Sequence, residues 1–270
     1  MNAGRLEGKV AVVVGGGSGM GRAGAIAMAA EGASIAVADI ALERAEAVVT
    51  SIREDRGAAD AVQVDVTSSE SVEHLVAETV SRFGRLDALY HCAADVPYVN
   101  TKDKRLTELE DEVWSRIIDV HLTGTFLVLK HTGQQMISQG SGSIIVSSTV
   151  DALVGCAGLD AYTAAKGGVT SMVRSFAAGI GSDGVRVNAI APSFVSTEPQ
   201  MVWLDDPTAR ATIGSLHILP IPTPEQIAPF VVYLASDESA AVTGTVFPID
   251  AGYMAFKARV DVMGTMQAGY

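Results

Sequence analysis

The sequence predicts an α/β fold: one doubly wound parallel sheet with helices on both faces. Two observations predict it. Short apolar runs alternate along the chain with longer segments of helical periodicity, and nearly all-apolar strands are typical of a parallel sheet covered on both faces. Glycine clusters follow several of these runs, as tight strand-to-helix turns require. Right-handed crossovers then place ligands at the carboxyl ends of the strands.

The apolar runs have the length and composition of buried strands. The first three of them end at Gly15, Asp39 and Asp65, which are residues typical of turns. We expect strands over residues 10–14, 34–38, 61–64, 88–92, 144–147, 185–190 and 246–249.

Helical periodicity fills most segments between the strands. We expect helices over 20–31, over 41–54, from a capping box at Thr67 and Glu70 to residue 83, over 110–136, over 162–180, and from a capping box at Thr223 and Gln226, with Pro224 in the first turn, to residue 235. The stretches 96–105 and 193–223 are expected to be loops. With no linker or repeat visible, residues 1–270 are predicted to form a single domain with a tail over 251–270.

The composition excludes several function classes. Of the 270 residues 48% are hydrophobic, and 19 basic and 31 acidic residues give a net charge of −12. Nucleic acids and anionic membranes select basic patches, so we expect neither as a partner. No apolar run of about 20 residues could cross a bilayer, and residues 1–9 lack a signal-peptide core, so a cytoplasmic protein is expected. Cys92 and Cys156 form no metal-ligand spacing, and no metal is expected.

The segment after the first strand predicts a dinucleotide-binding turn. The positions of Gly15, Gly19 and Gly21 suit a turn, a close approach of the backbone to a pyrophosphate, and close helix–strand packing. The helix that follows offers free backbone N–H groups and the positive end of its dipole to the phosphates. The sheet is therefore expected to be of the Rossmann type.

Asp39, at the end of the second strand, favours NAD as the cofactor. A carboxylate about 20 residues beyond the glycine cluster accepts hydrogen bonds from the adenosine ribose and repels a 2′-phosphate. No Arg or Lys lies between Gly15 and Met20, and Ile40 follows Asp39, so no local cation is expected to offset this repulsion. Asp39 could also be the N-cap of the next helix. Asp65 could reach the adenine edge or be a solvated turn residue.

Tyr162 and Lys166 are four residues apart near the start of a predicted helix, so they share one helical face. An ammonium close to a phenol stabilises the phenolate and is expected to lower its pKa from about 10. A positively charged nicotinamide ring would lower the pKa further. This makes Tyr162 a candidate proton acceptor for an alcohol.

Taken together, the motifs resemble those of the short-chain dehydrogenase/reductase family, over roughly residues 6–252. The residues that carry the resemblance are Gly15-Gly16-Gly17-Ser18-Gly19-Met20-Gly21, Asp65-Val66, Ser143-Ile144-Ile145, Tyr162-Thr163-Ala164-Ala165-Lys166 and Val187-Asn188-Ala189-Ile190-Ala191-Pro192.

The resemblance implies that Tyr162 is the catalytic acid/base and that Lys166 binds the nicotinamide ribose and tunes Tyr162. It also implies a homodimer or homotetramer. Groups near Val195 and Thr197 would hold the carboxamide. The residues expected at the cofactor are Gly15, Gly17, Ser18, Gly19, Met20, Gly21, Asp39, Ile40, Asp65, Val66, Cys92, Ala93, Ala94, Tyr162, Lys166, Pro192, Val195 and Thr197.

The chain departs from the family pattern at two positions that touch catalysis. The family's helix-borne asparagine aligns with His121, whose imidazole could hold a proton-relaying water, could itself titrate near neutrality, or could merely fill the core. A gap-free alignment places Thr149 at the substrate-orienting serine, with Ser148 one residue away. Threonine keeps the hydroxyl that donates to the reacting oxygen, so we expect Thr149 to fill this role. Further departures from the family pattern are Val14 for its usual threonine, His91-Cys92-Ala93-Ala94 for its usual Asn-Asn-Ala-Gly, and Ser193 for its usual glycine.

These observations predict an NAD(H)-dependent oxidoreductase that interconverts a secondary alcohol and a ketone. Apolar residues between 200 and 222 favour a mainly apolar small-molecule substrate. The alternative is a non-catalytic NAD-binding sensor or scaffold, which the altered residues His91, Cys92 and His121 motivate. The apolar tail over 251–270 is expected to cross a subunit interface.

Overall fold

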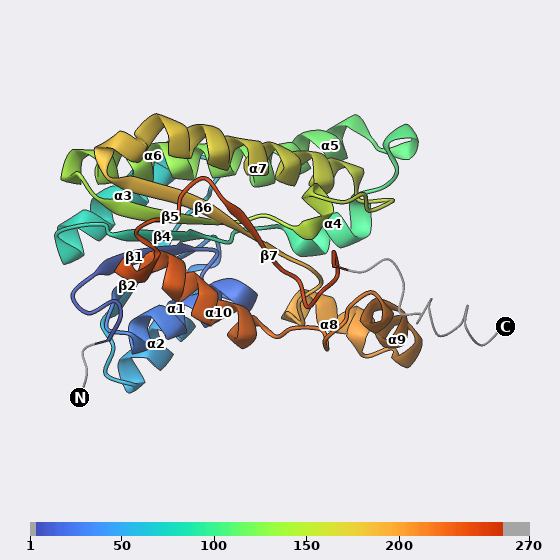
Figure 1. Cartoon of the computed structure of the whole chain (residues 1–270), viewed down its shortest axis with the longest axis horizontal. Helices are drawn as coiled ribbons and strands as arrows, with labels where there is room; N and C mark the ends of the chain where they lie inside the picture. Colours follow the sequence, from blue (N-terminus) through green and yellow to red (C-terminus); the bar gives the residue numbers. More distant parts are fainter. Residues whose placement is uncertain (1–3, 256–270) are drawn as a thin grey trace, which may run out of the picture.

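A seven-stranded parallel sheet forms the centre of the molecule (Figure 1). The computed structural model describes residues 4–255. The strand order is β3-β2-β1-β4-β5-β6-β7. The strands are β1 (Val10–Val14), β2 (Ser34–Asp39), β3 (Ala59–Gln63), β4 (Ala88–His91), β5 (Gly142–Ser147), β6 (Val185–Pro192) and β7 (Val246–Ile249). The predicted fold class is confirmed, and every predicted strand overlaps an observed one.

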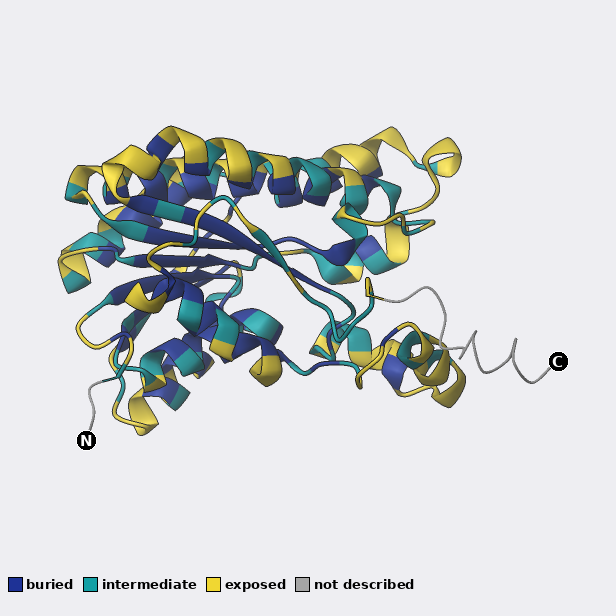
Figure 2. Cartoon of the chain, viewed as in Figure 1, coloured by how far each residue is buried: buried dark blue, intermediate teal, exposed yellow. Residues whose placement is uncertain are grey.

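Helices cover both faces of the sheet (Figure 1). On one face lie α1 (Gly19–Ala30), α2 (Leu42–Glu54) and α10 (Pro224–Ala235), and on the other lie α3 (Ser69–Phe83), α6 (Gly124–Gln139) and α7 (Asp160–Ile180). Successive side chains of β1 point to opposite faces, so Val13 packs against the first group of helices and Val14 against the second. Figure 2 shows the central strands buried between the two layers, which is why these strands are mainly apolar, whereas the edge strands β3 and β7 are partly exposed.

The long helix expected over 110–136 is interrupted. It consists of α5 (Asp111–Ile118), a π-helical turn η2 (Asp119–Thr123) and α6. Single π turns inside helices are frequent at functional sites. This one carries His121, the residue that replaces the family's asparagine.

Both stretches expected to be loops contain short helices, so those two predictions are wrong. They form α4 (Val96–Lys102), α8 (Glu198–Leu204) and α9 (Pro207–Ser215). Two of these helices begin at an aspartate whose side chain accepts a hydrogen bond from a backbone N–H of the first turn: Asp95 for α4 and Asp206 for α9. Each of the three helices has a proline in its first turn, where the missing N–H is harmless.

The start of α3 also differs from the prediction by one residue. Its N-cap is Ser68, whose hydroxyl accepts a hydrogen bond from Ser71 N. The Thr67 hydroxyl instead donates to Asp65 Oδ1 over 2.7 Å, so Thr67 belongs to the turn and not to a capping box. The capping box at Thr223 and Gln226 is present as predicted.

Shorter 3-10 turns complete the described part of the chain. They are η1 (Leu106–Glu108), η3 (Val150–Ala152), η4 (Gly181–Asp183) and η5 (Asp237–Ser239). Within residues 4–255 no helix is both long and apolar enough to cross a bilayer. Most of the tail, including the part expected to cross a subunit interface, lies outside the described residues.

Candidate active site

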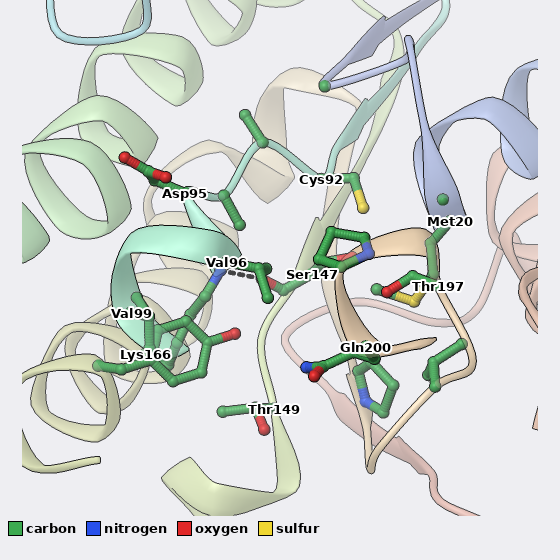
Figure 3. A pocket seen from close by; sticks show the side chains of 18 of the residues that line it. Met20, Cys92, Asp95, Val96, Val99, Ser147, Thr149, Lys166, Thr197 and Gln200 are labelled. Carbon is green, nitrogen blue, oxygen red and sulfur yellow. Dashed lines mark hydrogen bonds between the residues drawn. The ribbon is translucent and has the colours of Figure 1, made fainter. Parts of the chain in front are cut away.

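A cavity of about 890 Å³ opens at the carboxyl edge of the sheet, where strand order reverses between β1 and β4. Doubly wound sheets bind their ligands at such a switch point. Figure 3 shows Met20 and Cys92 at one end of the cavity, and Lys166, Thr149 and Gln200 around the other. Of the residues predicted for the site, all but Gly17, Gly21 and His121 line the cavity.

The glycine turn between β1 and α1 is shaped to receive a flat, extended group. Gly15 has φ +78°, and a Cβ added to it would lie 2.6 Å from Ala93 N. A side chain there would therefore clash with the turn after β4. Ser18 is the N-cap of α1, and its side chain makes no capping hydrogen bond. Gly15, Ser18, Gly19 and Met20 of this turn line the cavity, as a pyrophosphate site requires.

The first turn of α1 already binds one anion. Gly19 N donates to Glu198 Oε2 over 3.2 Å, and Arg22 pairs with the same carboxylate. Glu198 thus stands in for an anionic group at the positive end of the helix dipole. The residues present therefore fit a nicotinamide dinucleotide: the glycine turn would hold its pyrophosphate and Asp39 its adenosine ribose.

Asp39 is fixed by two backbone groups. Its Oδ2 accepts from Gly17 N and its Oδ1 from Ala41 N, each over 3.0 Å. The N-cap of α2 is Ala41, so the expected N-cap role of Asp39 is wrong. A carboxylate has about four acceptor positions, so Asp39 can still accept hydrogen bonds from ribose hydroxyls.

The expectation that no cation lies near Asp39 is also wrong. Arg44, from the first turn of α2, lines the same cavity, and its Cβ lies 2.7 Å from where a side chain on Gly17 would begin. Arg44 is exposed, so its guanidinium can turn toward the adenosine end. Asp65 is exposed and accepts hydrogen bonds from the N–H and hydroxyl of Thr67, as expected of a turn residue.

Tyr162 and Lys166 lie on one face of α7, as the spacing predicts. Lys166 is buried, and its Nζ donates to the carbonyl of Ser147 at the end of β5 over 2.8 Å (Figure 3). Its Nζ also lies 5.7 Å from the centre of the Tyr162 ring. The first turn of the helix is held by Asp103, which accepts a hydrogen bond from Tyr162 N over 2.9 Å.

Burial dominates the ionisation of both groups. It raises the pKa of Tyr162 well above its ordinary value, and the nearby Asp151 and Cys92 raise it further. Burial lowers the pKa of Lys166 to about 8. The expectation that the lysine lowers the phenol pKa is therefore wrong for the chain by itself, because desolvation is the largest effect on the Tyr162 pKa and raises it.

Ser148 and Thr149 point their hydroxyls in different directions. The Ser148 hydroxyl lies 2.9 Å from Thr170 Oγ1 and donates to the carbonyl of Lys166, so both of its partners belong to α7. Thr149 projects into the cavity (Figure 3). Its hydroxyl donates to Asp151 Oδ2 over 3.1 Å. Thr149 is thus the better-placed of the two, in agreement with the gap-free alignment.

His121 is buried behind Tyr162. The two rings meet edge to face with centroids 5.1 Å apart, and neither ring nitrogen of His121 has a hydrogen-bond partner among the described residues. Burial, and then the charge of Lys166, lower the pKa of His121 to about 3. The imidazole is therefore neutral at physiological pH, and the expectation that it titrates near neutrality is wrong.

His91 forms a second buried imidazole next to His121. The Thr125 hydroxyl donates a hydrogen bond to the carbonyl of His121, so its oxygen accepts a hydrogen bond from His91 Nε2–H over 3.0 Å. His91 Nδ1 is then an acceptor, and it has no partner among the described residues. The replacement of the family's usual asparagine by His91 thus leaves a buried, unpaired polar atom near His121.

Sequence reasoning missed several groups on the substrate side of the cavity. Ser193, where the family has glycine, hydrogen-bonds with its hydroxyl to His217 Nε2 over 2.9 Å, and this bond ties the segment after α9 to the turn after β6. Gln200 accepts a hydrogen bond from Asn100 over 3.2 Å and so joins α8 to α4. The other missed lining residues include Arg44, Asp151, Cys156 and Tyr253.

Comparison with known proteins identifies relatives along most of the chain. The family model that matches residues 14–254 is described as Enoyl-(Acyl carrier protein) reductase. The chain is 38% identical over 258 residues to a 3-alpha-(or 20-beta)-hydroxysteroid dehydrogenase of Mycobacterium tuberculosis, covering 96% of this chain and 94% of that protein. It is 34% identical over 248 residues to a 3-oxoacyl-acyl-carrier-protein reductase of Thermotoga maritima, covering 92% and 98%.

A solved structure shows the same likeness. The crystal structure of levodione reductase superposes with a TM-score of 0.86 at 31% identity, covering 93% of this chain and all of the other. Sequence similarity, fold and the placement of the motif residues thus lead to one assignment. The chain belongs to the short-chain dehydrogenase/reductase family of oxidoreductases.

Proposed function

We propose that the chain is an NAD-dependent dehydrogenase that interconverts a secondary alcohol and a ketone, with Tyr162 as the acid/base. The observation that carries the proposal is the placement of Tyr162 and Lys166 on one helical face, in the cavity that starts at the glycine turn. On oxidation the alcohol loses a hydride from carbon and a proton from oxygen. The relative named as a hydroxysteroid dehydrogenase supports an alcohol as the substrate class.

Three residues of the chain have separate roles in the proposed reaction. Tyr162 takes the proton from the alcohol oxygen, and Thr149 donates a hydrogen bond to that oxygen as charge develops on it. Lys166 keeps two N–H groups beyond the one bound to Ser147, and these can hold the nicotinamide ribose. The nicotinamide, when bound, accepts the hydride, and its positive charge favours the phenolate that burial disfavours.

Asp39 supports NAD over NADP, but Arg44 makes the choice a competition between two side chains. The Asp39 carboxylate is fixed beside the glycine turn, whereas Arg44 is exposed on the rim. A fixed, buried charge repels a 2′-phosphate more strongly than an exposed, solvated guanidinium attracts it. The balance therefore favours NAD.

We expect a preference for NAD over NADP of at least about tenfold in kcat/KM, which is ~1.4 kcal/mol. Asp39→Asn removes the charge at constant size and should flatten this ratio. Adding Arg44→Ala to Asp39→Asn should then lower kcat/KM with NADP again, because the cation that attracts the 2′-phosphate is lost. Steady-state kinetics with both cofactors measure these ratios, and a wild-type preference for NADP would contradict the assignment.

His121 is proposed to hold a water in the proton relay behind Tyr162, since its two unpaired ring nitrogens are the polar partners that a buried water needs. His121→Asn should keep most of the activity, whereas His121→Leu should lose it. Because the pKa of His121 is about 3, wild type and His121→Asn should share one pH profile near neutrality. Equal kcat values for wild type, asparagine and leucine variants would leave His121 as a packing residue.

The proposal extends to the surroundings of the enzyme. We propose that it acts in the cytoplasm as a homodimer or homotetramer, without nucleic acid or membrane as a partner. Its net charge of −12 supports the exclusion of anionic partners.

A further inference from the structure

Asp151 places a carboxylate inside the substrate end of the cavity. It lies in the turn η3, two residues after Thr149, and it lines the cavity together with Cys156 and Tyr253. Its charge acts on the phenols of both Tyr162 and Tyr253, whose pKa values it raises. The carboxylate therefore lies close to the position where the substrate oxygen must meet Tyr162.

This carboxylate has no cationic partner in residues 4–255. Besides Arg44, which lies at the cofactor end, Lys166 and Arg116 line the described part of the cavity, and both are engaged with other groups. Lys166 donates to Ser147, and Arg116 pairs with Asp95 over 2.7 Å while lying over the ring of Tyr98. A partly buried carboxylate without a cation must be stabilised by hydrogen-bond donors.

The described residues supply only some of the hydrogen-bond donors that the Asp151 carboxylate can accept. The Thr149 hydroxyl donates to Asp151 Oδ2 over 3.1 Å, and the Cys156 thiol, a weak donor, is the other hydrogen-bonding group beside the carboxylate. About four acceptor positions exist on a carboxylate, so capacity remains on the side that faces the cavity. The free acceptor positions of Asp151 therefore favour a ligand that carries a hydrogen-bond donor.

We propose that Asp151 binds a second hydroxyl group of the substrate, so that the cavity selects 1,2-diols and the corresponding hydroxy ketones over simple alcohols. The inference rests on the proposed function and names its substrate class. Thr149 Oγ1 and Asp151 Oδ2 are hydrogen-bonded to each other, so two substrate oxygens bound to them also lie close together. Hydroxyls on adjacent carbons have this spacing.

The same contact couples substrate choice to catalysis. With a simple alcohol, the Thr149 hydroxyl keeps its hydrogen bond to Asp151, and this bond competes with donation to the reacting oxygen. The second hydroxyl of a diol donates a hydrogen bond to Asp151 in its place and so frees the Thr149 hydroxyl to donate to the reacting oxygen. Asp151 is therefore a specificity-determining residue that favours the diol both by binding it and by freeing Thr149.

The test compares cyclohexanol with trans-cyclohexane-1,2-diol in wild type, Asp151→Ala and Asp151→Asn. Wild type should oxidise the diol at least about tenfold better in kcat/KM, the effect of one hydrogen bond to a charged group. Asp151→Ala should lower kcat/KM for the diol and raise it for cyclohexanol, because Thr149 is then free. The kcat/KM values of Asp151→Asn should lie between those of wild type and Asp151→Ala for both substrates. Asp183→Ala, which removes an exposed carboxylate outside the cavity, is the matched control.

NADH binding, followed by fluorescence, verifies that each variant is folded. Equal oxidation of both alcohols by wild type, or an equal loss on both in Asp151→Ala, would overturn the inference and leave the proposed function standing. No NADH formation with any secondary alcohol would contradict both.

Discussion

Replacing Tyr162 with phenylalanine is expected to lower kcat by about 10²-fold or more, while NADH binding stays unchanged. In the proposed mechanism the phenol carries the proton of the alcohol, while its ring packs edge to face against His121 without needing the hydroxyl. Removing the oxygen therefore removes the chemistry and keeps the fold. Steady-state kinetics and a fluorescence titration with NADH measure the two quantities.

A matched variant separates this loss from the general effect of deleting a phenol. Tyr233→Phe removes a hydroxyl on α10, outside the cavity, and should leave kcat unchanged. In wild type, alcohol oxidation should accelerate toward alkaline pH, because burial raises the Tyr162 pKa and the phenolate is the reactive form. Near wild-type turnover by Tyr162→Phe would show that another group carries the proton.

Replacing Thr149 with valine is the second large effect we expect. Valine keeps the shape of threonine and removes the hydroxyl that is proposed to donate to the reacting oxygen. Loss of such a donor costs ~2.7–4 kcal/mol, or about 10²–10³-fold in kcat. The variant and wild type are compared with trans-cyclohexane-1,2-diol as the substrate. With this diol the Thr149 hydroxyl is expected to be free of its hydrogen bond to Asp151 in the wild-type reference.

Ser148→Ala is the paired control, because it removes the neighbouring hydroxyl. That hydroxyl bonds to Thr170 and to the Lys166 carbonyl, so its loss should affect thermal stability more than turnover. A large loss of turnover confined to Ser148→Ala would mean that the alignment behind Thr149 is off by one residue.

The strands and the main helices followed from the sequence because apolar periodicity reports burial directly. The short helices did not, since α4 and α9 have too few residues for a periodic pattern. Their start signals were present nevertheless: Asp95 and Asp206 each precede a proline by one or two residues, which is an N-cap followed by a first-turn proline. The π turn at His121 left no such signal.

The sequence predicted the parts of the candidate site that lie within one helix, because residues four apart share a helical face, as Tyr162 and Lys166 do. Residues brought in by tertiary structure were missed. Arg44 reaches the cofactor end because α2 returns over the glycine turn, and His217 reaches Ser193 because the segment after α9 packs on the turn after β6. The ionisation of Tyr162 was misjudged because it depends on burial, which helical spacing does not report.

The most direct test of the proposed function is the near-ultraviolet absorbance of the NADH or NADPH that the wild-type protein forms from NAD or NADP with a panel of secondary alcohols that includes 1,2-diols. We expect steady formation of reduced cofactor, with NAD favoured over NADP. Binding of NADH without turnover of any alcohol in the panel would contradict it, and would instead indicate a non-catalytic NAD-binding sensor or scaffold.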